Sequence, residues 1–246
     1  AKAIQQNLPV TIETSVGHLD KARQNVRSTK PTQPTTSDKD NLIKDTLYTV
    51  TIPVSEIQHS DLTGRLPKSR RGHEYILLTA SNGYLHPEPQ RTRSAADYIK
   101  SHAMTAAFFK ARGIHIPTVC RLDNETSAEL EQYLHNELNL RIEYVPPGNH
   151  RTLIAERGIR TLKNHCISTW AGLSDNFPLT THWDDTLPQI EITLNSLQPY
   201  TPDPAISAYE GIYGHPYDFS SHPLAPLGCL VCAHDRPSQR GTWMNH

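Results

Sequence analysis

The spacing of apolar residues along the chain predicts strands in five segments. β-Branched residues are concentrated in Tyr48–Gln58, and shorter apolar segments follow at Tyr75–Thr79 and Gly83–Pro87. Runs of this kind, bounded by polar and turn-forming residues, are typical of strands. The dipeptide Asn82-Gly83 lies between the second and third segments and predicts a hairpin turn. The remaining two predicted strands are Thr118–Leu122 and Arg141–Val145.

Capping signals predict two helices between these strands. Ser94, followed three residues later by Asp97, resembles a capping box, and Gly113 predicts the end of the helix that it opens. Thr126 and Glu129 repeat the signal and predict a second helix after the fourth strand.

Two more helices are predicted in the second half of the chain. Apolar residues recur from Ala155 to Leu173 at offsets 0, 4, 7, 11, 15 and 18, which places them on one face of a five-turn helix. A further helix is predicted at Trp183–Leu194. It contains Pro188, which we expect to kink it because proline has no amide hydrogen to donate.

The order of these elements predicts an α/β fold. Three early antiparallel strands followed by β-α-β units match a ribonuclease H-like fold, with a mixed five-stranded sheet and helices on both faces. We expect residues 1–45 to form a polar, partly disordered N-terminal extension, because residues 28–41 are rich in Ser, Thr, Pro and Lys. Residues 46–200 would form the core, and residues 201–246 a C-terminal extension that begins a truncated tail.

Composition limits the partners that the chain is expected to have. Basic and acidic residues number 24 and 25, for a net charge of −1, whereas a nucleic-acid-binding domain is usually more basic. Any basic surface must therefore be local. No segment approaches the roughly 18 apolar residues of a membrane span, so a membrane partner is not expected. Cys229 and Cys232 form one C-x-x-C pair, which indicates either two buried thiols on a strand or a zinc site.

Three carboxylates are the candidates for chemistry. Asp61 and Asp123 follow predicted strands, and Glu156 lies in the first turn of the longest helix. In an α/β sheet, strand ends and helix starts meet at one edge. Carboxylates gathered there repel one another unless cations neutralise them, and oxygen ligands suit Mg²⁺ or Mn²⁺. Two such ions can hold both the attacking and the leaving oxygen of a phosphodiester.

The helix that carries Glu156 has a second charged feature. Glu156, Arg160 and Lys163 stand at offsets 0, 4 and 7 and share a face beside the apolar one. Such a face could combine a metal-binding carboxylate with cations for phosphates. The alternative is a solvated face with an ordinary ion pair between residues four apart.

Several motifs in order resemble the retroviral and retrotransposon integrase core. Asp61-Leu62-Thr63-Gly64 with Gly72-His73-Glu74-Tyr75 is similar to the first motif, and Leu122-Asp123-Asn124-Glu125 to the second. Val145–Arg151 followed by Ala155–Lys163 is similar to the third. Further segments resemble the region downstream of the core in copia-like elements, so that the resemblance covers about residues 55–243. These segments are Trp183-Asp184, Thr193-Leu194-Asn195, Ser207-Ala208-Tyr209 and Pro223–Gly228.

The resemblance implies an integrase-type polynucleotide transferase that trims DNA ends and joins them to target DNA. Asp61, Asp123 and Glu156 would be the catalytic triad and would bind the cofactor, two Mg²⁺ or Mn²⁺ ions. DNA would be the substrate, and the protein would act as a homo-oligomer. DNA would be bound by His150, Arg151, Arg160 and Lys163. Asn124 and Asn149 would hydrogen bond to the metal ligands.

The chain departs from the family pattern at two positions, and other functions stay open. Leu153 stands where the family usually has Asn, and Gly158 where a small helix former is usual. These departures favour an alternative, a catalytically decayed, transposon-derived module that binds nucleic acid. A third hypothesis is a ribonuclease H-type hydrolase, which shares the carboxylates but cuts RNA–DNA hybrids.

Overall fold

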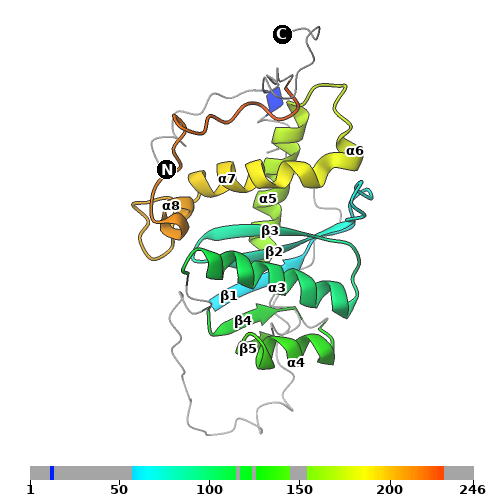
Figure 1. The fold of residues 1–246 in the computed structure, drawn as a ribbon, viewed down its shortest axis with the longest axis vertical. Coiled ribbons are helices and arrows are strands. Elements are labelled where there is room, and N and C mark those ends of the chain that lie inside the picture. Colours follow the sequence, from blue (N-terminus) through cyan, green and yellow to red (C-terminus); the bar gives the residue numbers. More distant parts are fainter. Residues whose placement is uncertain (1–11, 14–56, 115–116, 124–125, 145–153, 230–246) are drawn as a thin grey trace, which may run out of the picture.

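A computed structural model describes residues 12–13, 57–114, 117–123, 126–144 and 154–229 (Figure 1). Its strands form one sheet in the order β3-β2-β1-β4-β5. The strands are β1 (Ile57–Leu62), β2 (Tyr75–Ser81), β3 (Tyr84–Gln90), β4 (Val119–Leu122) and β5 (Arg141–Tyr144). The helices are α3 (Ala95–Ala111), α4 (Ala128–Asn136), α5 (Ile154–Ala171), α6 (Leu179–His182), the 3₁₀ helix η4 (Trp183–Thr186), α7 (Leu187–Leu197) and α8 (Ala208–Tyr213).

The sheet is mixed, as the order of elements predicts. β1 pairs antiparallel with β2 and β2 with β3, whereas β1 and β4, and β4 and β5, are parallel. The predicted hairpin turn joins β2 to β3, with Asn82 at φ 51° and Gly83 at φ 87°. Positive φ at both central residues is what a tight two-residue hairpin requires. The predicted five-stranded α/β class is therefore confirmed.

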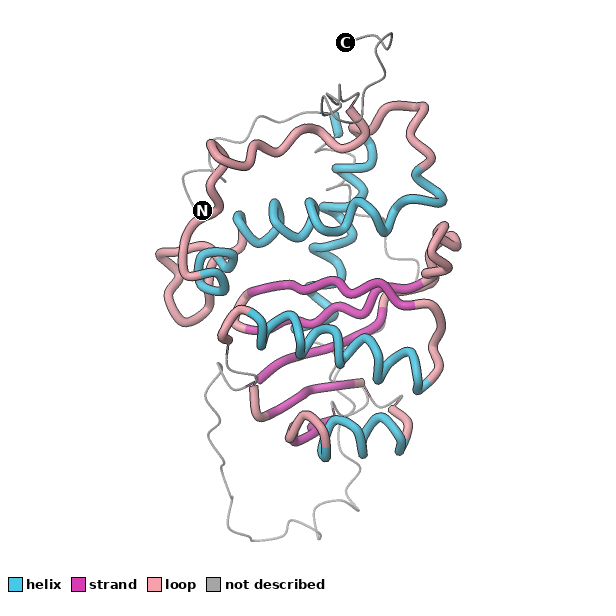
Figure 2. Tube along the Cα trace, viewed as in Figure 1, coloured by secondary structure: helices cyan, strands magenta, loops and turns pink. Residues whose placement is uncertain are grey.

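Helices cover both faces of the sheet (Figures 1 and 2). α3 and α4 lie on one face, where Leu130 and Leu134 of α4 pack against Cys120 and Leu122 of β4. α5 crosses the other face against β1 and β2, and its buried residues join a larger cluster with β2, β3 and α7. In the described part of the chain, no helix is long and apolar enough to cross a membrane.

α7 covers the edge of the sheet with a side-chain amide. The fully buried Asn195 accepts a hydrogen bond from the backbone N–H of Leu85 at 2.8 Å and donates one to its carbonyl oxygen at 2.9 Å. An edge strand leaves such backbone groups without a neighbouring strand. The Asn195 side chain therefore makes the two hydrogen bonds to Leu85 that a further strand beside β3 would otherwise make.

Three element boundaries differ from the sequence predictions. The strand predicted at 48–58 lies in the structure at Ile57–Leu62, and residues 48–56 are outside the described ranges. Asp61 is thus inside β1, where the polar residues do not show the alternating pattern of a strand.

Ser127, rather than Thr126, caps α4 by accepting a hydrogen bond from the backbone N–H of Leu130 at 3.3 Å. Pro188 does not kink a helix, because α7 begins beside it and the first turn needs no proline N–H.

The loop between β1 and β2 is fastened to the start of α7. The carboxylate of Asp184 has no exposed surface and accepts hydrogen bonds from Ser69 Oγ at 2.9 Å and His73 Nδ1 at 2.7 Å. The indole N–H of Trp183 donates to the carbonyl oxygen of Pro67 at 2.7 Å. We call these contacts the Asp184 clamp. They fix the segment downstream of Asp61.

The C-terminal part of the described chain packs against the same fold. α8 buries Ala208 and Ile212 against Tyr84 and Phe109. Cys229, expected to be buried on a strand, is instead exposed and is a free thiol, while Cys232 lies outside the described residues.

Candidate active site

The register of β1 and β4 places two of the predicted carboxylates side by side. His59 pairs with Arg121 in this parallel ladder, so the same offset sets Asp123 beside Asp61. Neighbouring strands lie about 4.8 Å apart. Asp61 also pairs with Leu78, whose side chain packs in the cluster beneath α5. Asp61 therefore lies near the end of β1 on the face of the sheet that α5 covers, and Asp123 directly follows the end of β4 beside it.

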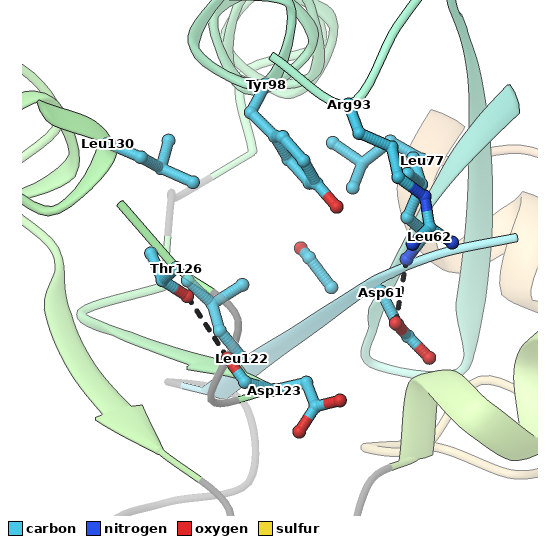
Figure 3. A pocket seen from close by; sticks show the side chains of 10 residues that line it. Asp61, Leu62, Leu77, Arg93, Tyr98, Leu122, Asp123, Thr126 and Leu130 are labelled. Carbon is cyan, nitrogen blue, oxygen red and sulfur yellow. Dashed lines mark hydrogen bonds between the residues drawn. The ribbon is translucent and has the colours of Figure 1, made fainter. Parts of the chain in front are cut away.

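A pocket of about 240 Å³ opens between these strand ends and the starts of α3 and α4 (Figure 3). Asp61 and Asp123 both line it, and Figure 3 shows their carboxylates on its lower side. Two residues that carry no signal in the sequence line the upper side: the hydroxyl of Tyr98 points into the pocket, and the guanidinium of Arg93 reaches toward Asp61.

Asp61 is the most perturbed group of the site. Burial is the largest cause that raises its pKa from 3.8 to about 6, and the negative charges of Asp123 and Glu156 act in the same direction. A hydrogen bond from the backbone N–H of Leu62 to Asp61 Oδ1, at 2.8 Å, and the charge of Arg93 oppose the shift. A cation beside Asp61 would relieve both the repulsion and the cost of burying charge.

Glu156, the third candidate carboxylate, is carried by α5. It lies exposed in the first turn of that helix, near enough for its charge to act on Asp61. The start of α5 passes beside the Asp61 carboxylate in Figure 3. Among the described residues, no three His, Cys, Asp or Glu side chains are already close enough to hold one metal ion. The donor set is nonetheless all carboxylate oxygen, which fits Mg²⁺ or Mn²⁺.

Basic side chains lie along the same face of α5. Arg160 and Lys163 are exposed, and Lys163 borders a groove with Thr63 and Gly64 after β1. In the described chain no ion pair joins Glu156 to Arg160, so the ordinary intrahelical pair is not formed. The two cations are therefore available to a phosphate backbone.

Five of the predicted positions lie outside the described ranges. Nothing in the structure bears on the hydrogen-bonding residues Asn124 and Asn149, on the DNA-contacting residues His150 and Arg151, or on Leu153.

Gly158 has a packing reason that its sequence context does not reveal. A Cβ built there would lie 2.9 Å from Leu78 Cδ2 and 3.0 Å from Leu85 Cδ2, tighter than ordinary van der Waals contact. The missing side chain lets α5 pack closely against Leu78 of β2 and Leu85 of β3. This close packing is a structural reason for glycine at position 158.

The comparisons with known proteins concern the fold. No family model and no curated protein matches the chain. Among solved structures, a chain of the simian T-cell lymphotropic virus intasome, in its cryo-EM structure with the PP2A regulatory subunit B56 gamma, matches with a TM-score of 0.53 and 17% identity. The match covers 76% of this chain and spans 63% of that chain.

The fold is integrase-like. A crystal structure of the catalytic core domain of BIV integrase also matches, with a TM-score of 0.47 and 14% identity, over 65% of this chain and 95% of that chain. At such identities the likeness concerns the fold alone. The likeness to the intasome chain agrees with the predicted ribonuclease H-like architecture, and it does not test the resemblance to copia-like elements.

Proposed function

We propose that the chain is the catalytic core of an integrase-type polynucleotide transferase that processes DNA ends and joins them to target DNA. The observation that carries the proposal is the pairing of Asp61 with Asp123 in one pocket, within the electrostatic reach of Glu156. Burial, and then the charges of Asp123 and Glu156, raise the pKa of Asp61, and a carboxylate held in this way is poorly suited to a purely structural role because its ionised form weakens the fold.

The chain's own residues would each contribute one part of the reaction. Asp61 and Asp123 would hold the metal cofactor from the sheet, and Glu156 from α5. When bound, two Mg²⁺ or Mn²⁺ ions supply activation of the attacking oxygen and stabilisation of the leaving oxygen. Arg160 and Lys163 would bind the DNA backbone by charge, which positions the strand without reading its sequence.

The bond changes balance without a covalent enzyme intermediate. In end processing, the oxygen of water attacks a phosphodiester phosphorus, and the bond from phosphorus to the departing 3′ oxygen breaks. In strand transfer, the 3′-hydroxyl of the processed end attacks a target phosphodiester in the same way. In each step the attacking group loses a proton and the departing alkoxide gains one. Because two DNA ends must be joined, we propose a homo-oligomer as the working form.

A DNA-joining assay with one matched pair of variants tests the proposal. The purified protein, with a labelled DNA end and Mg²⁺ or Mn²⁺, should shorten the end and produce joined products. Asp123→Asn should reduce joining by at least about a thousandfold, on the scale of losing an essential electrostatic group. The exposed Asp175→Asn should keep full activity. Joining that survives Asp123→Asn would exclude this assignment.

One observation favours the decayed binding module as a second candidate. Glu156 is exposed, and among the described residues the three carboxylates do not already form a ligand set. A Mn²⁺ titration followed by thermal unfolding separates the two functions. A metal-dependent rise in Tm that Asp61→Asn removes supports the enzyme, and DNA binding without such a rise supports the module. Preferential cutting of an RNA–DNA hybrid would instead indicate the hydrolase.

A further inference from the structure

A second cavity, of about 330 Å³, lies on the α5 side of the sheet. It is bounded by the first two turns of α5, the start of β1 and the hairpin between β2 and β3. Its volume falls at the lower end of the range of small-molecule pockets, about 300–1,000 Å³. Ile57, Leu85 and Ile154 supply apolar wall, while His59, Asn82 and Arg157 supply polar groups.

Two buried polar atoms belong to residues that line this cavity. His59 is 3% exposed, and neither its Nδ1 atom nor the carbonyl oxygen Oδ1 of Asn82 has a hydrogen-bond partner in the described ranges. Buried polar atoms in folded proteins nearly always have a partner, because losing water without gaining one is costly. An imidazole nitrogen and an amide oxygen without partners, both in residues that line the cavity, thus favour a ligand with hydrogen-bonding edges.

The cavity adjoins the carboxylate site. His59 and Asp61 are two residues apart on the same face of β1, which corresponds to about 7 Å along a strand. Arg157, at the cavity, directly follows Glu156 in α5. The positive charges of Arg157 and Arg121 both act on His59. A ligand in this cavity would therefore lie about as far from the proposed reacting phosphate as one nucleotide lies from the next. The Arg157 side chain would lie beside it.

We propose that this cavity receives one unstacked nucleobase of the DNA strand held at Asp61 and Asp123. The apolar wall would cover the faces of the base, and His59 and Asn82 would hydrogen bond to its edge, as sites for extrahelical bases do. Arg157 would contact the adjoining phosphate. A free inorganic anion fits less well, because the Asn82 carbonyl oxygen would repel it. The inference rests on the proposed function in one respect, which is that the base belongs to the DNA strand held at Asp61 and Asp123.

Binding of DNA that lacks a single base tests the cavity. The probe is a labelled duplex with a short unpaired end, in which an abasic site replaces each unpaired position in turn. Fluorescence anisotropy should show binding weakened about tenfold, equivalent to about 1.4 kcal/mol, for an abasic site at one position. If binding is equal at every position, the cavity does not take a base, which is also the result expected if a segment of this chain fills it.

Two variants then connect that base to the named residues. Asn82→Gly removes the carbonyl oxygen and tolerates the φ of 51°, and His59→Phe keeps a ring without nitrogen. Each should weaken binding about tenfold for intact DNA and leave binding to the sensitive abasic DNA unchanged. Lys163→Gln is the matched control, and it should weaken both by the same factor, because a phosphate contact does not depend on the base.

The outcomes separate this inference from the proposed function. Equal losses for intact and abasic DNA with both variants would overturn the base site. If the protein joins DNA ends while showing no sensitivity to base removal, the base site alone fails. If the protein binds no DNA end at all, both fail.

Discussion

Ionised Asp61 is an unfavourable charge in the folded chain. Because its pKa is raised on folding, from 3.8 to about 6, it lowers stability as pH rises through that interval, and the full cost is present above it. We expect Asp61→Asn to raise the free energy of unfolding by about 1 kcal/mol at about pH 8 in the absence of divalent metal. The shift alone would give more, but the carboxylate is partly exposed and water screens it. Urea denaturation measures the change.

The same substitution has an opposite effect once metal is added. Wild-type protein should gain stability from Mn²⁺, because the ion binds only the folded carboxylates, and Asp61→Asn should not. The exposed Asp175→Asn should behave as wild type in both conditions. An Asp61→Asn protein that is less stable than wild type without metal would contradict a buried, unfavourable charge at Asp61.

Residues of the candidate site can be predicted from the sequence only where they lie in a recognisable motif. Asp61 and Asp123 stand in recognisable motifs, and the structure places them in one pocket. Arg93 and Tyr98 escape prediction because their place in the pocket depends on how α3 packs over the sheet. His59 escapes it because one histidine in a polar stretch gives no local signal. Its alternation with Asp61 on β1 becomes meaningful only once the strand boundary is known.

At the scale of elements, the Asp184 clamp determines how the loop after β1 meets α7. Asp184→Ala should lower the free energy of unfolding by about 3 kcal/mol, because Ser69 and His73 lose a buried, charged acceptor. Asp185→Ala is the adjacent control. Its ion pair with Arg71, at 2.7 Å, lies on the surface and should contribute less than about 1 kcal/mol. Denaturant titration of both variants measures the difference, and equal losses would contradict a buried clamp.

Element types are easier to predict than their boundaries. The apolar stripe from Ala155 gives α5 correctly, because a helix buried along one face must repeat its apolar residues with helical spacing. The pattern places the end of β1 too early, at Gln58, because His59, Ser60 and Asp61 are polar yet lie in the strand. Polar residues stand at the candidate site where a sheet usually carries apolar ones, so the strand signal is weakest there.

For the whole molecule, one buried charge network links the sheet edge to its covering helix. Burial acts to lower the pKa of His86, but the hydrogen bond to Glu191 and the negative charges of Glu191 and Glu88 outweigh it and raise the pKa from 6.5 to about 9. His86 Nδ1 donates to Glu191 Oε1 of α7 at 2.7 Å, and the ring stacks on Phe108 of α3 at 4.1 Å between centroids. Through these two contacts His86 joins β3 to both α7 and α3.

This network should determine stability at alkaline pH. A histidine whose pKa rises on folding contributes stability that is complete below 6.5 and is lost as pH rises through about 9. We expect the free energy of unfolding to fall by about 3 kcal/mol across that window, measured by urea denaturation at successive pH values. Glu191→Gln should start less stable and show a much smaller fall, because it removes the main partner of the charged ring. A wild-type profile that stays level through the window would mean that His86 is neutral in the folded chain, and α7 would then be held to β3 by Asn195 and apolar packing alone.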